Sequence, residues 1–529
     1  MTIVLADLYR HQLSDRGDEI AFQAPGGTTT FGEFHQRVLE TAGWLRAQGV
    51  KPSDVVAVWM VNRVDWLALL FAISRVGGTL AAVNTRYKSG DVQHVLRQSG
   101  ATMLIMEASF LKIDFLSILA DVDFEQTPSL KHISIFSDNT SLPNFPEITV
   151  SRFEPTSAQA ALGEADAHDA QTPSILFVTS GTTKAPKLVA HCAHTFHYNA
   201  GKVIASQKYD HDTRLLAALP LCGVFCLMGV FTNLMAGGQT VLMETFEGQE
   251  AARLLLKHRI THLYGSEELY IRIAENIPEG SDLSFAHFYG IASFNASLRV
   301  VGPKLLKLGF PLGSLYGSSE ILGYVASFYD DPDVEVRLTP GGYPIAGAEF
   351  EMRVRDLETG ELLPPNHSGA LEVRTPANFV GYYNNPEATQ EAITEDGYFK
   401  TGDMAQITPD GALIYEGRMG DAYRLAGYLV NAEEVEDVMN AIEGVREAHF
   451  VVVRHQGENH AAAFVMLEPD SDLTGASIQA ILRAGLASYK VPRNVWIVQE
   501  FPMAHGTNGS KVRKEVLRSD AINRLSTGL

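Results

Sequence analysis

The residues from Thr179 to Lys187 have the composition of a loop that binds a polyphosphate. The segment reads Thr-Ser-Gly-Thr-Thr-Lys-Ala-Pro-Lys and follows a strand-like apolar run at 174–178. It offers closely spaced backbone N–H donors, hydroxyl groups and two cations, which suit phosphate oxygens that accept hydrogen bonds and carry charge. It is not a Walker A loop, because Pro186 stands where that motif requires glycine before the lysine. A plain surface loop is the alternative for such a run taken alone.

Three further segments carry groups that could act on a nucleotide. The loop 316–320 (Tyr-Gly-Ser-Ser-Glu) offers two hydroxyls and a carboxylate, the hard oxygen groups that accompany phosphate and Mg²⁺. Asp403 follows Thr401-Gly and could accept hydrogen bonds from two ribose hydroxyls, with a simple Asx turn as the alternative. Lys511 lies in a glycine-containing segment from which a lysine could reach another domain's site; a solvated basic tail is the alternative.

Size and composition narrow the class of protein. A chain of 529 residues should form two to four structural units, and 46% apolar with 20% charged residues is ordinary for a globular enzyme. The net charge of −20 argues against a general nucleic-acid binder. Three cysteines give no paired framework, and the N-terminus lacks the features of a signal peptide. We therefore expect a cytoplasmic protein.

Two competing interpretations of local patterns are weak. His191, His194 and His197 are spaced i, i+3, i+6, so on one helix the outer pair would diverge by about 120° and share a metal poorly. We expect helix-surface or pocket-lining roles for them. The uncharged stretch 215–243 is long enough to cross a membrane, but Pro220 and several glycines interrupt it. It is better explained as a strand, a buried helix at 224–235 and a second strand.

The order of apolar runs predicts the fold. Continuous apolar strands at 55–61, 102–106 and 260–264 alternate with helical patterns at 65–76 and 249–258, which indicates parallel sheets covered by helices. After about residue 340, short strands and turn residues suggest a small antiparallel or barrel-like unit, and the last 110 or so residues suggest a separate α+β unit. The predicted class is α/β and α+β, with a large N-terminal domain of helix-covered sheets plus a small barrel-like unit, a hinge, and a small mobile C-terminal α+β domain.

Eight segments, taken in order, resemble those of the adenylate-forming superfamily, which includes acyl- and aryl-CoA synthetases, luciferases and peptide-synthetase adenylation domains. The segments are 179–187, 219–221, 316–320, 381–386, 396–403, 417–436, 489–493 and 502–511. They look most like those of AMP-forming CoA ligases. The resemblance implies an adenylation domain at 1–418, a hinge at 419–421 and a mobile C-terminal domain at 422–529 that rotates between two half-reactions.

The resemblance also implies the chemistry and the residues that carry it. A carboxylate would attack the α-phosphate of ATP to give an acyl adenylate and pyrophosphate, and the thiol of coenzyme A would then displace AMP. The implied ligands are ATP, Mg²⁺, coenzyme A and a small carboxylic acid. A homodimer is a further candidate assembly. By motif match, the implied catalytic residues are Lys511, Glu320 (which also holds the metal) and Ser319; ATP is bound by Thr179, Ser180, Gly181, Thr182, Thr183, Lys187, Tyr316, Asp403 and Arg418; Gly427 lines the CoA channel.

The acid pocket is predicted from the same match. Its candidate lining residues are Cys222, Gly223, Cys226, Tyr264, Gly265, Asn295 and Leu322, which indicate an apolar cavity that suits aliphatic and aromatic acids alike. The chain departs from the family pattern at Lys184 and Leu188, where glycine is usual, and at Cys222 and Gly223, where an aromatic residue and histidine are usual. Gly420 replaces the usual hinge Asp or Lys. Because Ser510 stands between Gly509 and Lys511, two lysines can be aligned with the catalytic lysine of the family: Lys511 and, as the other candidate, Lys514.

Several rival functions stay open at this point. The enzyme could load a carrier protein, or stop at the acyl adenylate as a luciferase-like enzyme would. A Walker-type NTPase is disfavoured by the missing Gly-Lys-Ser/Thr sequence. A non-catalytic binding protein with a degenerate loop is the remaining alternative.

Overall fold

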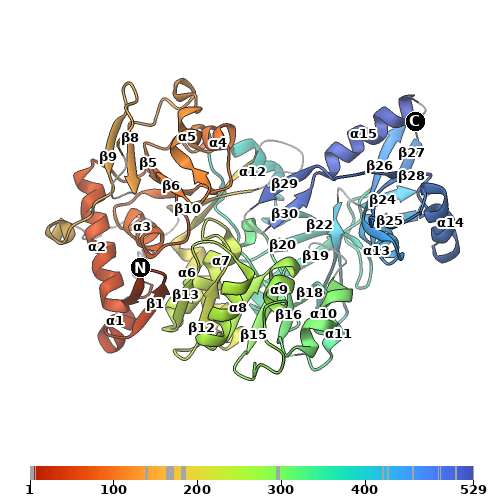
Figure 1. Cartoon of the computed structure of the whole chain (residues 1–529), viewed down its shortest axis with the longest axis horizontal. Coiled ribbons are helices and arrows are strands. Elements are labelled where there is room, and N and C mark those ends of the chain that lie inside the picture. The colour runs from red at the N-terminus through yellow and green to blue at the C-terminus, as the bar shows by residue number, and fades with distance from the viewer. Residues whose placement is uncertain are drawn as a thin grey trace.

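The structure is a computed structural model, and it describes residues 5, 8–136, 141–162, 172–179, 186–292, 298–329, 331–419, 422–425, 428–455, 458–486, 488, 490–506 and 509–527. A large N-terminal part is built on two extended sheets, and a smaller C-terminal part lies at one end of it (Figure 1). In the described part of the chain, no helix is both long and apolar enough to cross a membrane.

The first large sheet has eight strands and a mainly parallel core. Its order is β21 (Gly381–Tyr382), β11 (Leu188–Cys192), β10 (Pro173–Val178), β4 (Thr79–Ala82), β3 (Val55–Trp59), β5 (Met103–Glu107), β8 (His132–Phe136) and β9 (Thr149–Arg152). The strands β10, β4, β3, β5, β8 and β9 pair in parallel, whereas β11 and β21 run antiparallel at one edge. Strand β3 is buried along its whole length, as its unbroken apolar sequence predicts.

The second large sheet has thirteen strands in two segments. The parallel segment holds β16 (Leu312–Tyr316), β15 (Phe288–Ile291), β14 (His262–Gly265), β12 (Arg214–Ala217), β13 (Gln239–Leu242) and β1 (Ile20–Ala24), with β2 (Gly27–Thr30) antiparallel at the edge. The antiparallel segment holds β19 (Glu351–Arg355), β20 (Gly369–Arg374), β22 (Phe399–Ile407), β23 (Leu413–Arg418), β18 (Gly341–Pro344) and β17 (Ala326–Ser327). The strands predicted after residue 340 thus form one end of this sheet.

Helices surround and separate these sheets. They are α1 (His11–Arg16), α2 (Phe31–Ala47), α3 (Val64–Arg75), α4 (Ser89–Ser99), α5 (Phe115–Ala120), α6 (Ala193–Gln207), α7 (Val224–Ala236), α8 (Gly248–Lys257), α9 (Glu267–Ala274), α10 (Leu298–Lys307), α11 (Val334–Arg337) and α12 (Pro386–Ala392). Helix α3 contacts β4 and β10, and its Phe71 stacks on Phe231 of α7 at 5.9 Å between ring centroids. Helix α7 in turn contacts β12 and β13. Both helices are buried almost throughout because both sides of each face protein.

Polar side chains join the two large sheets where their strands end. Asn62, just after β3, donates to the carbonyl of Leu219 at 2.8 Å and accepts from the N–H of Leu221 at 2.8 Å. Arg63 forms an ion pair with Glu107, the last residue of β5 in the first sheet, at 2.9 Å. It forms another with Glu244, just after β13 of the second sheet, at 2.6 Å. Burial outweighs the arginine and raises the pKa of Glu107. Asn62 thus holds both ends of the segment 219–221, and Arg63 links the two sheets beside it.

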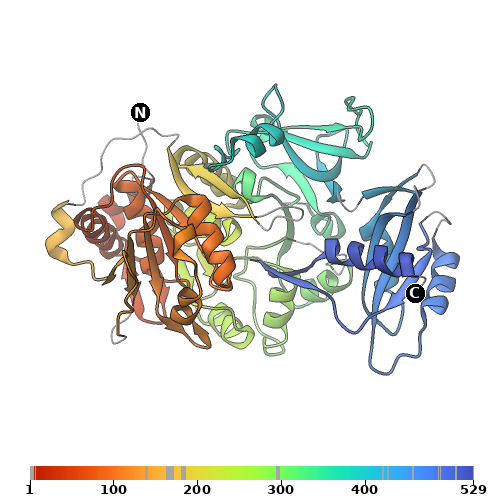
Figure 2. The same ribbon diagram turned by 90° about the horizontal axis from the view of Figure 1, so that it is seen from above.

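The C-terminal part is a separate α+β unit with its own cores. Strands β26 (Val445–His455), β27 (Glu458–Leu467) and β28 (Asn494–Ile497) form one sheet, and β24 (Ala422–Leu425) pairs with β25 (Tyr428–Asn431). Helices α13 (Ala432–Asn440), α14 (Gly475–Gly485) and α15 (Lys514–Thr527) pack on it. The hairpin of β29 (Met503–Gly506) and β30 (Gly509–Val512) projects from this unit toward the large part in both views (Figures 1 and 2).

Candidate functional site

The predicted phosphate loop lies in the sequence between β10 and β11, which pair antiparallel, and the structure describes its two ends. At its base, the N–H of Thr179 donates to the carbonyl of Lys187 at 2.9 Å, and the N–H of Lys187 donates to Thr179 Oγ1 at 3.3 Å. His94 of α4 donates through Nε2 to the carbonyl of Pro186 at 2.8 Å. Both ends of the loop are therefore held in place, and a strand rather than a helix follows it. The remaining predicted loop residues, Ser180, Gly181, Thr182, Thr183 and Lys184, lie outside the described residues.

Lys187 and Glu320 meet on one aromatic side chain. The ammonium of Lys187 lies 4.3 Å from the ring centroid of Tyr382, and the Tyr382 hydroxyl donates to Glu320 Oε1 at 2.9 Å. Tyr382 is 8% exposed. Burial and the neighbouring carboxylate raise the pKa of Tyr382, so the phenol keeps its proton and can donate. A cation, a ring, a hydroxyl and a carboxylate thus form one continuous chain of contacts.

A buried histidine holds the short turn η4 (Ser319–Ile321), which carries the next two candidates. His191 of β11 is fully buried, and its Nε2 contacts the carbonyl of Ser319 at 2.7 Å. Burial lowers the pKa of His191 to about 4, so the imidazole is neutral. A carbonyl can only accept, so the single ring proton must be on Nε2. His191 therefore fixes the backbone beside Glu320.

The three histidines are not on one helix. His191 ends up on a buried strand, whereas His194 and His197 are exposed on α6, because the chain changes from strand to helix between Cys192 and Ala193. The helix-surface role is confirmed for the last two and wrong for the first. Among the described residues, no group of three or more metal-ligating side chains is found.

The turn after Glu320 has a tightly constrained backbone. Leu322 adopts a left-handed conformation with φ 55°, and its carbonyl accepts from Asn199 Nδ2 at 2.8 Å. A side chain at Gly317 would place its Cβ 1.4 Å from the carbonyl oxygen of Gly323, so only glycine fits there. Strained backbone of this kind concentrates at functional sites.

Three of the predicted nucleotide-binding residues form one polar group. The Tyr316 hydroxyl donates to Asp403 Oδ2 at 2.7 Å, and the Arg418 guanidinium lies 2.9 Å from Asp403 Oδ1. Asp403 and Arg418 face each other across β22 and β23. Asp403 is 3% exposed, whereas the Arg418 side chain is 49% exposed and has its pKa raised chiefly by the carboxylate. The pair presents a fixed, partly open polar edge.

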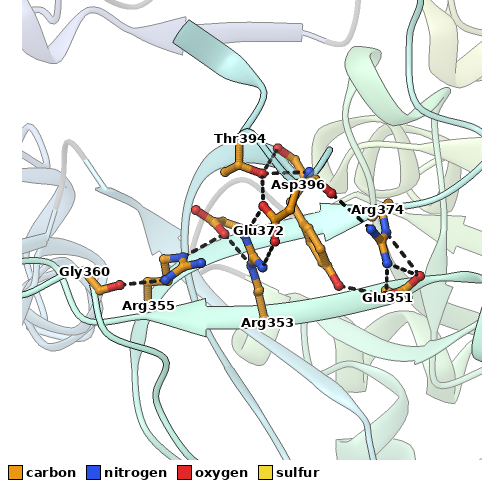
Figure 3. A network of polar contacts seen from close by, with 9 residues as sticks. Glu351, Arg353, Arg355, Gly360, Glu372, Arg374, Thr394 and Asp396 are labelled. Carbon is orange, nitrogen blue, oxygen red and sulfur yellow. Dashed lines mark hydrogen bonds and ion pairs between the residues drawn. The ribbon is translucent and has the colours of Figure 1, made fainter. Parts of the chain in front are cut away.

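An ion-pair network positions the segment that leads into Asp403 (Figure 3). Arg353 of β19 binds Glu372 at 2.6 Å and Asp396 at 2.9 Å, and it lies over the ring of Tyr398 with 3.8 Å to the centroid. Arg374 donates to the carbonyl of Asp396 at 3.0 Å. The hydrogen bond from Arg353 lowers the pKa of the Asp396 carboxyl. The turn before β22 is thus held by two arginines from neighbouring strands.

The predicted acid-pocket residues come from three elements that meet near η4. Cys222, Gly223 and Cys226 lie at the start of α7, Tyr264 and Gly265 at the end of β14, and Leu322 directly after η4; Asn295 lies outside the described residues. Burial raises the pKa of both Cys222 and Cys226 to about 12. These thiols are therefore protonated, which makes them poor nucleophiles.

Tyr264 belongs to a rigid aromatic wall. Its ring stacks on Tyr324 at 4.8 Å, and Phe225 meets both rings edge-on at 5.7 Å. An added Cβ would lie 2.9 Å from the Tyr264 ring at Gly229 and 2.7 Å at Gly290, so the ring has no room to move. The Tyr264 and Tyr209 hydroxyls are 2.5 Å apart.

The two lysine candidates near the C-terminus differ clearly. Lys511 is on β30, where it pairs with Ala504 of β29 in the projecting hairpin. Lys514 begins α15, and its ammonium lies 2.9 Å from Glu436 Oε1, which also accepts from the N–H of Phe450 at 2.7 Å. Glu436 is 7% exposed. Lys514 is therefore engaged inside the small domain, and the assignment of the catalytic role to Lys511 stays a prediction.

Sequence reasoning left three supporting residues unassigned. Tyr382 lies in the segment 381–386, whereas His94 and Asn62 lie in none of the eight segments. Each acts through a partner far away in sequence, so only the folded geometry reveals it. Gly427 and Gly420, at the predicted channel and hinge, lie outside the described residues.

Comparison with known proteins decides the family. Residues 9–383 match the model of the AMP-binding enzyme family, and residues 434–507 match the model of the AMP-binding enzyme C-terminal domain. The chain belongs to the AMP-binding enzyme family. Its relatives in this family are acyl- and aryl-CoA ligases and adenylating enzymes, and the chain is accordingly an adenylate-forming ligase.

Individual AMP-binding enzymes match over nearly the whole chain. The 3-[(3aS,4S,7aS)-7a-methyl-1,5-dioxo-octahydro-1H-inden-4-yl]propanoyl:CoA ligase of Mycobacterium tuberculosis is 30% identical over 95% of this chain and 96% of its own length. The 2,3-dihydroxybenzoate-AMP ligase of Bacillus subtilis is 27% identical over 99% and 94%. The ATP-bound structure of MatB from Rhodopseudomonas palustris shares the fold, with a TM-score of 0.82, 23% identity and 99% coverage of both chains.

Proposed function

We propose that this protein is an AMP-forming acid–CoA ligase. A carboxylate would attack the α-phosphorus of ATP, breaking the bond to pyrophosphate and forming an acyl adenylate. The sulfur of coenzyme A would then attack the acyl carbon, releasing AMP and leaving a thioester. The observation that carries the proposal is the convergence of Lys187 with Glu320 on Tyr382, in a chain whose relatives include CoA ligases.

The roles of the nucleotide-binding residues follow from their chemistry. The fixed Asp403 carboxylate would accept hydrogen bonds from the ribose hydroxyls, with Arg418 as its charge partner and Tyr316 beside it. Thr179, Lys187 and the loop between them (with Ser180, Gly181, Thr182 and Thr183) would hold the β- and γ-phosphates. Ser319 would contact the α-phosphate, since η4 places it next to Glu320.

The donor set beside the phosphate loop fits Mg²⁺. Glu320 supplies a carboxylate of which Tyr382 bonds one oxygen, and the hydroxyl of Ser318 is buried with no partner among the described residues. Hard oxygen ligands of this type suit magnesium bound together with nucleotide phosphates. When bound, the ion would screen the phosphate charge that repels an incoming carboxylate.

Lys511 is the proposed catalytic lysine. A cation directed at the carboxylate and the α-phosphate would stabilise the negative charge that develops in the first step, by about 3 kcal/mol or more. For thiolysis this lysine must leave, so we propose that residues 422–529 rotate against 1–418 about a hinge at 419–421. The rotation would bring Gly427 beside the CoA channel, where a bulky residue such as Trp should slow the thioester step and spare adenylation.

One experiment tests the reaction class. Exchange of labelled pyrophosphate into ATP is measured with a panel of straight-chain, branched and ring-bearing acids, with and without Mg²⁺. Selective exchange with one class of acid supports adenylation. Release of phosphate and ADP, with no acid supporting exchange, would refute the proposal.

One relative supports an alternative in which the reaction ends at the acyl adenylate or continues to an acceptor other than coenzyme A. The relative that is 27% identical over 99% of this chain is named as an AMP ligase rather than a CoA ligase. Supplying the adenylate with coenzyme A, with a carrier protein or with water distinguishes the three outcomes by the product formed. We expect the CoA thioester.

A further inference from the structure

We propose that Tyr382 is a positioning residue that couples binding of the nucleotide triphosphate at Lys187 to binding of a divalent cation at Glu320. The inference rests on the proposed function and assigns a role to a residue outside the predicted site. Its ring holds the ammonium and its hydroxyl holds the carboxylate, at 4.3 Å and 2.9 Å respectively. One side chain therefore controls the geometry of both charged groups.

The backbone around Tyr382 ties it to both partners independently. Strand β21 pairs with β11, which begins directly after Lys187, and Val189 lies opposite Tyr382 in that pairing. Three residues before Tyr382, the N–H of Phe379 donates to the carbonyl of Glu320 at 2.7 Å. Phe379 also meets the Tyr382 ring edge-on at 4.9 Å. The backbones that carry Lys187 and Glu320 are therefore both fixed relative to the segment that carries Tyr382.

The two contacts have different physical consequences. A free lysine side chain loses rotamer freedom when it binds phosphate, and a ring that already holds it extended lowers that entropic cost. A hydrogen bond to one carboxylate oxygen orients the other, and outer partners of this kind typically change metal affinity 10- to 100-fold. A tyrosine hydroxyl is protonated at neutral pH, so it can donate to the charged carboxylate. Removing the hydroxyl and removing the ring should thus give separable effects.

The test is calorimetric binding of ATP to the full-length protein, without acid, in EDTA and in excess Mg²⁺. Tyr382→Phe keeps the ring, so ATP should bind in EDTA as it does to wild type, while the enhancement by Mg²⁺ falls about 10-fold. Tyr382→Leu removes the ring as well, so ATP in EDTA should also bind about 2- to 10-fold more weakly. Tyr383→Phe is the matched control: the neighbouring tyrosine makes its β11 contact through its backbone N–H, which donates to the Leu188 carbonyl at 2.8 Å.

The outcomes separate this inference from the proposed function. If Tyr382→Phe responds to Mg²⁺ as wild type does, the hydroxyl has no orienting role and the coupling is refuted. A Tyr382→Leu variant with wild-type affinity in EDTA would refute the role of the ring. Equal losses in all conditions for both variants, with a lowered melting temperature, would mean that Tyr382 is only structural. Wild-type protein whose ATP affinity ignores Mg²⁺ would overturn the magnesium part of the proposed function together with this inference.

Discussion

Replacing His191 by glutamine should change how the stability of the large domain depends on pH. His191 is fully buried and neutral, with a pKa of about 4 against an ordinary value of 6.5. The unfolded chain therefore binds a proton between these values that the folded chain does not. The resulting stability is fully present above pH 6.5 and is lost as the pH falls toward 4. At about 1.4 kcal/mol per pKa unit, the total amounts to about 3 kcal/mol.

The effect is measurable within a mild pH range. Between pH 7 and pH 5, linkage predicts that His191 lowers the free energy of unfolding of wild type by about 2 kcal/mol. Glutamine can still donate to the Ser319 carbonyl but does not titrate, so His191→Gln should lack this component. Urea unfolding followed by tryptophan fluorescence reports chiefly on the large domain, because Trp44, Trp59 and Trp66 all lie in it.

The control is a second buried histidine. Burial also lowers the pKa of His262 to about 4, and this residue is present in both proteins, so its contribution cancels in the comparison. If wild type and His191→Gln lose stability in parallel from pH 7 to pH 5, then His191 is not held neutral by burial. The argument for its tautomer and for its hold on Ser319 would then fail as well.

Three further substitutions test other parts of the molecule. Lys511→Ala should reduce pyrophosphate exchange by at least 100-fold while leaving thioester formation from supplied acyl adenylate close to wild type; equal loss in both steps would contradict the assignment. Asp403→Asn should raise the KM for ATP by about 30- to 150-fold, since a charge-assisted acceptor is worth about 2–3 kcal/mol; an unchanged KM would remove Asp403 from the ribose site. Glu436→Gln should destabilise the small domain by about 2–4 kcal/mol because it leaves the Lys514 ammonium without its buried partner, and an unchanged melting profile would argue that this ion pair is unimportant.

The sequence predicted the regular elements well where apolar runs were continuous. The buried helix expected at 224–235 is α7 (Val224–Ala236), and the strand expected at 55–61 is β3 (Val55–Trp59). The secondary structure of such segments can be predicted because nearly every residue in them is buried, so the local sequence pattern agrees with the tertiary environment.

Long-range contacts could not be read in this way. The regular spacing of His191, His194 and His197 suggested one helix, but a strand ends between the first and the second. Tyr382 reaches Lys187 and Glu320 only because β21 pairs with β11 at the edge of a sheet, and a linear sequence does not specify that pairing. The burial of Lys514 against Glu436 depends similarly on how α15 packs beside α13. The sequence thus indicated which side chains could take part in the chemistry, but not which residues each of them contacts.

The junction made by Asn62 and Arg63 has a mechanical consequence. Because it joins the two large sheets at the ends of their strands, it opposes sliding of one sheet past the other. The large part would then stay rigid during turnover, and any rearrangement between the two proposed steps would fall to the smaller domain.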